Sequence, residues 1–127
     1  MAKVLGLGGL FFKADDPEAT REWYARVLGI GFEGWGGVVF EPATAAAHPG
    51  AGTVFCPFEA DTEYFAPSQE RFMFNLMVDD LPGMLAQCAR HGVEPVLEMP
   101  DEANGSFAHI VDPDGRKIEL WQPKPMA

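Results

Sequence analysis

The chain has 127 residues, of which 47% are hydrophobic, so it can form one compact domain without disulfide or metal staples. Its 19 acidic and 9 basic side chains give a formal net charge of −10, which argues against nucleic-acid binding because phosphates are repelled. No apolar run approaches the roughly 18 residues of a membrane span. Two cysteines and the lack of an apolar leader predict a cytoplasmic protein with free thiols.

The first half of the chain begins with a strand-like run over 7–14 and continues with a well-capped helix. Asp16 can cap this helix, Pro17 suits its first position, and Gly29 supplies its C-terminal stop. Further extended segments are expected at 31–32, 35–40 and 53–58, with a loop over 42–52 that is rich in Ala, Pro and Gly.

The second half repeats this order of elements. A strand-like run over 71–78 leads to a helix that Asp80 can cap and that ends at His91-Gly92. Extended segments follow at 94–99, 106–111 and 117–122, the last two joined by a turn over 112–115. Each half therefore reads βαβββ, with module one at about 4–60, module two at about 70–123 and a connector over 59–70. The predicted fold class is α+β, in a single domain over 1–127.

Several motifs in both halves together resemble a known superfamily. They are Asp16-Pro17-Glu18-Ala19 before a helix with Trp23-Tyr24, then Val27-Leu28-Gly29, Val78-Asp79-Asp80-Leu81, Gly92-Val93-Glu94 and the hairpin over 112–121. The chain thereby resembles the vicinal oxygen chelate superfamily, which contains glyoxalase I, bleomycin-resistance proteins and extradiol dioxygenases. The resemblance implies that the two modules form a cupped half-barrel with its ligand on the concave face. It also implies a homodimer.

Strand alternation assigns the side chains of the last hairpin to faces. If Ile118 and Leu120 pack under a helix, then Glu119 points to the other, concave face. The same rule turns His109 toward that face, so that His109 and Glu119 are expected to be neighbours across the hairpin. This pair is the candidate for acid/base catalysis. The alternative is that both are ordinary strand residues with satisfied hydrogen bonds.

Other inward-facing positions are candidates for the wall of a ligand cavity. They are Phe11, Trp35, Phe55, Met73, Asn75, Phe107 and Trp121. Most of them are apolar, as in small-molecule pockets, while Asn75 can orient a ligand or hold a water. The alternative is that the aromatic members belong to the ordinary core.

The resemblance also implies positions for metal ligands, and these positions lack donors. Glu119 matches the second-module carboxylate, whereas the other three positions fall on Gly9, Met73 and a residue near Phe55. Divalent cations of this kind need oxygen or imidazole donors, which Gly, Met and Phe do not supply. We therefore expect no metal cofactor, with Glu119 as the one candidate ligand. The alternative is a divalent metal bound through an altered set of ligands.

Two functions remain open from the sequence. The missing ligand positions favour a protein that binds a small organic molecule in the concave cavity, because binding needs only shape, apolar walls and a few polar anchors. The alternative is an enzyme of the same superfamily, a lyase, isomerase or dioxygenase, with His109 and Glu119 as an acid/base pair or as altered metal ligands.

Overall fold

Helix α1 (Pro17–Leu28) begins and ends where the sequence predicts. The computed structural model describes residues 1–126. The Asp16 side chain accepts a hydrogen bond from the Ala19 amide, and Gly29 ends the helix in the left-handed conformation with φ 74°. One face of α1 is buried, because its apolar residues recur at helical spacing.

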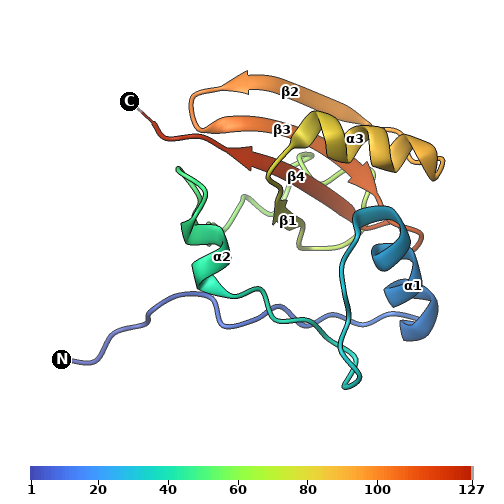
Figure 1. The fold of residues 1–127 in the computed structure, drawn as a ribbon, viewed down its shortest axis with the longest axis horizontal. Coiled ribbons are helices and arrows are strands. Elements are labelled where there is room, and N and C mark those ends of the chain that lie inside the picture. The colour runs from blue at the N-terminus through green and yellow to red at the C-terminus, as the bar shows by residue number, and fades with distance from the viewer. Residues whose placement is uncertain (127) are drawn as a thin grey trace.

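Helix α3 (Leu81–Arg90) is built in the same way. The Asp80 side chain accepts a hydrogen bond from the Gly83 amide, and His91 is the C-terminal cap. Figure 1 shows α3 lying across one face of the sheet, with α1 beside it. The two predicted helices are thus both confirmed.

A four-stranded sheet forms from the second half of the chain (Figure 1). Its strands are β1 (Phe74–Met77), β2 (Leu97–Glu102), β3 (Gly105–Val111) and β4 (Lys117–Pro123), in the order β1-β4-β3-β2. β1 and β4 are parallel, and the other two pairs are antiparallel. The second module therefore has the predicted βαβββ order, and the α+β fold with an open, curved sheet agrees with the half-barrel implied by the resemblance.

The core lies between this sheet and the two helices. Ala108, Ile110, Ile118 and Leu120 are fully buried, and they pack with residues of α1 and α3. These four are the residues that alternation assigned to the helix side, so the predicted register of the β3–β4 hairpin is confirmed.

The first half differs from its prediction. In the described part of the chain, the segments 7–14, 31–32, 35–40 and 53–58 are not strands, and the expected loop over 42–52 contains a short helix, α2 (Pro42–Ala46). A strand needs a neighbour for its backbone and a surface that buries one of its faces. Figure 1 shows the N-terminal end of the chain running apart from the sheet, and although the Phe12 ring packs against Phe74, the backbone of 7–14 has no neighbouring strand in the described residues. The four-stranded sheet is built entirely by the second half.

None of the helices within residues 1–126 has the length and apolar character that crossing a bilayer requires.

Candidate functional site

Three polar side chains from neighbouring strands meet on the sheet face opposite α3. The strand register pairs Glu119 of β4 with Asn75 of β1 on one side and with His109 of β3 on the other. Asn75 Nδ2 donates to Glu119 Oε1 at 2.7 Å, and His109 Nε2 lies 2.8 Å from Glu119 Oε2. The predicted contact between His109 and Glu119 is confirmed, while their role in binding or catalysis stays a prediction.

A fourth member of this cluster comes from the connector between the two halves. The Tyr64 hydroxyl donates to Glu119 Oε2 at 2.5 Å, and the Tyr64 ring stands edge-on to the His109 ring with centroids 5.1 Å apart. Lys117 Nζ donates to the Tyr64 carbonyl oxygen at 2.8 Å. The connector therefore lies over the polar row, and Glu119 accepts hydrogen bonds from three side chains.

Tyr64 and Lys117 were not among the candidates from the sequence. Lys117 has the same parity as Glu119 and Trp121 on one strand, so alternation alone could have found it. Tyr64 lies in the segment 59–70, which has no strand or helix periodicity, so no pattern in the sequence points to it.

The surroundings of Glu119 keep its carboxylate ionised. The residue is 8% exposed, and burial alone would raise the pKa of Glu119. The hydrogen bonds from His109, Tyr64 and Asn75 outweigh burial and lower the pKa of Glu119. Burial and the bond to Glu119 also raise the pKa of the Tyr64 hydroxyl, which stays a neutral donor. The cluster thus consists of one negative carboxylate, Glu119, and the three side chains that form hydrogen bonds with it.

His109 has one ring nitrogen without a partner. Because an ionised Glu119 can only accept, Nε2 of His109 carries the hydrogen of their bond. His109 is 0% exposed, and within the described residues its Nδ1 is buried with no hydrogen-bond partner. In the neutral imidazole, Nδ1 then presents a lone pair that can accept a hydrogen bond from a bound molecule.

An aromatic pair flanks the polar row on the same face. Phe107 and Trp121 face each other across the hairpin and stack in parallel, with ring centroids 5.9 Å apart. Both lie two residues along their strands from His109 and Glu119, so all four side chains share one face. Trp121 is 5% exposed and Phe107 is half-buried, so the pair places packed apolar rings beside the charge.

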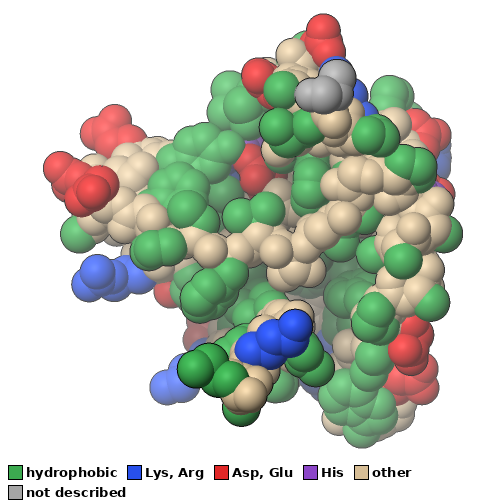
Figure 2. Space-filling view, turned by 90° about the vertical axis from the view of Figure 1, so that its left-hand side faces the viewer, with side chains coloured by type: hydrophobic (Ala, Val, Ile, Leu, Met, Phe, Trp, Pro, Cys, Tyr) green, Lys and Arg blue, Asp and Glu red, His purple; other side chains and the backbone are tan. Residues whose placement is uncertain are grey.

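The other predicted wall residues are placed differently. Met73, directly before β1, is half-buried. Phe11, Trp35 and Phe55 are 92%, 70% and 88% exposed, on first-half segments that form no strands in the described chain. The single chain therefore does not bring these three aromatic side chains into a buried wall around Glu119. Figure 2 shows hydrophobic side chains spread over one face of the molecule.

The side chains around Glu119 do not fit the metal that the superfamily resemblance implies. Both carboxylate oxygens already accept hydrogen bonds, and Gly9, Met73 and Phe55 carry no oxygen or nitrogen donor in their side chains. Among residues 1–126, no group of three or more His, Cys, Asp or Glu is placed to hold a metal ion. We therefore derive no chemistry through a metal.

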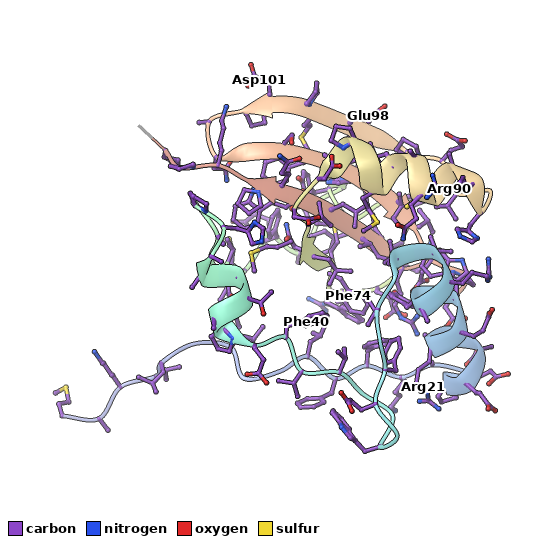
Figure 3. All side chains as sticks on the ribbon, in the orientation of Figure 1. Arg21, Phe40, Phe74, Arg90, Glu98 and Asp101 are labelled. Carbon is purple, nitrogen blue, oxygen red and sulfur yellow. The ribbon has the colours of Figure 1, made fainter. Side chains whose placement is uncertain are left out.

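Two open grooves lie elsewhere on the surface. One, of about 330 Å³, runs between α3 and strands β2 and β3 and includes Leu85, Glu98 and Ser106. In Figure 3 the labelled Glu98 lies on β2, the outer strand of the sheet that borders this groove. The other groove, of about 250 Å³, lies at the start of α1. Neither groove is lined by His109 or Glu119, whose cluster is covered by Tyr64.

Comparison with known proteins agrees with this architecture. A search of the curated proteins finds no match to the chain. The model of the glyoxalase-like domain family matches residues 9–121, which include α1, α3 and the whole sheet except the end of β4. Since the match spans most of the sequence and the second half has the expected βαβββ order, the chain belongs to the glyoxalase-like domain family, within the vicinal oxygen chelate superfamily.

Proposed function

We propose that the protein binds a small organic molecule on the concave face of its sheet, without the metal of the superfamily. The observation that carries this proposal is the ionised, buried Glu119 beside the stacked Phe107–Trp121 pair. Apolar rings next to a few fixed polar groups are the usual composition of a small-molecule site. Asn75 and His109 fix the carboxylate, and the aromatic pair supplies the apolar contact.

A screen of small organic molecules by native mass spectrometry tests this proposal. We expect at least one compound to stay bound to the wild type and to Glu98→Ala, since Glu98 is exposed on β2 and outside the cluster. The same compound should be lost in Glu119→Ala, provided that circular dichroism shows a folded variant. A compound that binds Glu119→Ala as well as the wild type, or no binding at all, would contradict the proposal.

The second candidate function is catalysis, and the contact between His109 and Glu119 favours it. A histidine whose Nε2 is held 2.8 Å from a carboxylate has a fixed orientation and tautomer, as a general base requires. The enzyme would be a lyase, isomerase or dioxygenase of the superfamily, with this acid/base pair or an altered metal site. Turnover that persists in chelator and is lost in His109→Gln would favour the metal-free enzyme over the binding protein.

We also propose that two copies of the chain form a homodimer. Both outer strands, β1 and β2, leave one edge without a neighbour in the described chain. Large apolar side chains such as Phe11, Phe40 and Phe55 are exposed on first-half segments. A second copy that pairs with these edges and covers these side chains would supply what the segments lack.

A further inference from the structure

Tyr64 differs from the other donors to Glu119 in how it is held. Asn75 and His109 sit on strands whose register fixes them beside Glu119. Tyr64 instead belongs to the connector, where Glu59, Asp61 and Glu63 are exposed. The connector backbone is tied to the sheet at this point by the bond from Lys117 Nζ to the Tyr64 carbonyl oxygen.

The surroundings of the Tyr64 side chain have the composition of a binding site for an aromatic ring. Phe58 stacks on the ring at 5.6 Å between centroids, the His109 ring meets it edge-on, and the Lys117 ammonium lies 5.5 Å from its centroid. The Tyr64 hydroxyl donates a hydrogen bond to Glu119. The apolar ring and the polar hydroxyl of Tyr64 are therefore each matched by the cluster, as those of a ligand would be.

The buried Nδ1 of His109 is an independent sign that the cluster is not complete. Buried polar atoms are nearly always hydrogen-bonded, so an unpartnered nitrogen on a residue that is 0% exposed needs an explanation. Tyr64 uses its one hydroxyl hydrogen on Glu119 and leaves Nδ1 unsatisfied. A bound molecule with a second donor would satisfy both acceptors.

We propose that Tyr64 is an internal occupant of the ligand site, and that the natural ligand displaces it with an aromatic ring that carries an uncharged hydroxyl for Glu119 and a second donor for Nδ1 of His109. This proposal rests on the function proposed above and names the chemical class of its ligand. The site holds both the negative Glu119 and the positive Lys117, so a ligand of either charge meets one like charge, whereas a neutral donor meets none. Displacement requires that the connector around Tyr64 moves off the sheet face and that the bond from Lys117 Nζ to the Tyr64 carbonyl oxygen breaks.

Removing the side chain of Tyr64 and supplying its free analogue tests the proposal. In Tyr64→Ala we expect p-cresol to bind at least about tenfold more tightly than in the wild type, because the Tyr64 hydroxyl no longer competes for Glu119 and a hydrogen bond to a carboxylate contributes that much. The matched probe is 4-methylanisole, which has the ring but no donor, and which should gain no such preference. Tyr64→Phe is the matched variant: its ring still fills the space, so p-cresol should not gain this affinity there. Equal gains for both probes, or no gain for p-cresol, overturn the proposal.

A second measurement uses the wild type and does not depend on how Tyr64→Ala folds. The chain has two tyrosines, so fluorotyrosine labelling gives two fluorine resonances, and Tyr64→Phe assigns them. Saturating p-cresol should move the Tyr64 resonance toward the position of an exposed ring. The Tyr24 resonance should stay fixed, because that ring is buried and its hydroxyl is bonded to Asp112. A Tyr64 resonance that does not move at saturation contradicts displacement.

The outcomes separate this inference from the proposed function. If a compound from the screen binds the wild type through Glu119 while the Tyr64 resonance stays in place, the site is real and Tyr64 is a fixed wall. If p-cresol fills Tyr64→Ala but no compound of the screen binds the wild type, Tyr64 only fills the space beside Glu119 and the proposed binding function fails.

Discussion

At the scale of single residues, Glu119 makes stability depend on pH. Its pKa is lowered in the folded protein, because the hydrogen bonds from His109, Tyr64 and Asn75 outweigh its burial. Such a group contributes stability above its unfolded pKa of about 4.3, and the contribution is lost as the pH falls through the folded pKa. We expect Glu119→Gln to be less stable than the wild type at pH 7. In urea unfolding, this difference should shrink as the pH is lowered below about 4.

Glu98→Gln is the control for this series, since Glu98 is exposed on β2. Its difference from the wild type should be within about 0.5 kcal/mol at neutral pH. A gap between Glu119→Gln and the wild type that stays constant from pH 7 to the acid limit would show that Glu119 acts through packing and not through its charge.

The same residue leads to a prediction about metals. Glu119 is the one acidic side chain at the superfamily ligand positions, and its oxygens are engaged by Asn75, His109 and Tyr64. A catalytic site for a transition metal usually has about three protein ligands. We expect elemental analysis of purified, dialysed protein to find far less than one Zn, Ni, Mn or Fe per chain. We also expect ligand binding to persist in chelator. Close to one metal per chain, lost in Glu119→Ala, would contradict this prediction and favour the alternative of a metal bound through an altered set of ligands.

The residues of the site were predictable only where a strand determines them. Alternation placed His109 and Glu119 on one face, because side chains in a strand point to the two faces in turn and the hairpin register then joins them. The same rule places Lys117 on the face of Glu119, because the two residues are two positions apart on one strand. Tyr64 reaches the cluster through the path of an irregular connector, which no periodicity in the sequence describes.

At the scale of elements, one buried network joins the first half of the chain to the last hairpin. Tyr24 of α1 donates its hydroxyl to Asp112 Oδ2 at 2.6 Å, and Asp112 also accepts hydrogen bonds from Arg116. Arg116 in turn donates to the carbonyl oxygen of Lys13. Both Asp112 and Arg116 are buried, so their polar atoms depend on these partners. The network fixes α1 to the turn between β3 and β4.

Tyr24→Phe tests how much this junction stabilises the fold. The substitution keeps the ring but removes a donor from a buried carboxylate, which costs about 1–3 kcal/mol in unfolding free energy. Arg26→Gln on the same helix is the control, because it breaks the exposed pair with Glu22 and should cost less than about 0.5 kcal/mol. Urea titrations of both variants check the ranking. Equal losses would mean that the buried bond adds nothing beyond the exposed pair.

The elements themselves were predictable where their signals are local. Asp16 and Asp80 cap the helices as predicted, and the four second-half strands fall within three residues of the expected bounds. The first-half strands were predicted from the same kind of pattern, yet 7–14 and 53–58 form no ladder in the described chain. A strand is completed by a partner that lies elsewhere, and the sequence of one segment does not say whether a single chain supplies it.

At the scale of the whole molecule, the first half exposes large apolar side chains. Phe11, Phe40 and Phe55 are exposed, and Figure 3 shows Phe40 on the coil outside the sheet to which Phe74 belongs. Large exposed apolar patches are rare on monomeric proteins. The free edges of β1 and β2 offer unpaired backbone groups to extended segments of another copy. These features together are the physical reason to expect a homodimer.

Light scattering coupled to gel filtration tests the dimer and its location. At micromolar concentration we expect twice the chain mass of 13.9 kDa. Phe11→Asp with Phe55→Asp places charge on exposed apolar positions, which a solvated surface tolerates and an interface does not, so this variant should elute as a monomer. Glu59→Gln with Glu63→Gln, two exposed acidic positions of the connector, is the control and should remain dimeric. A strictly monomeric wild type would contradict the homodimer. A dimer that withstands both aspartates would place the interface on the sheet edges alone.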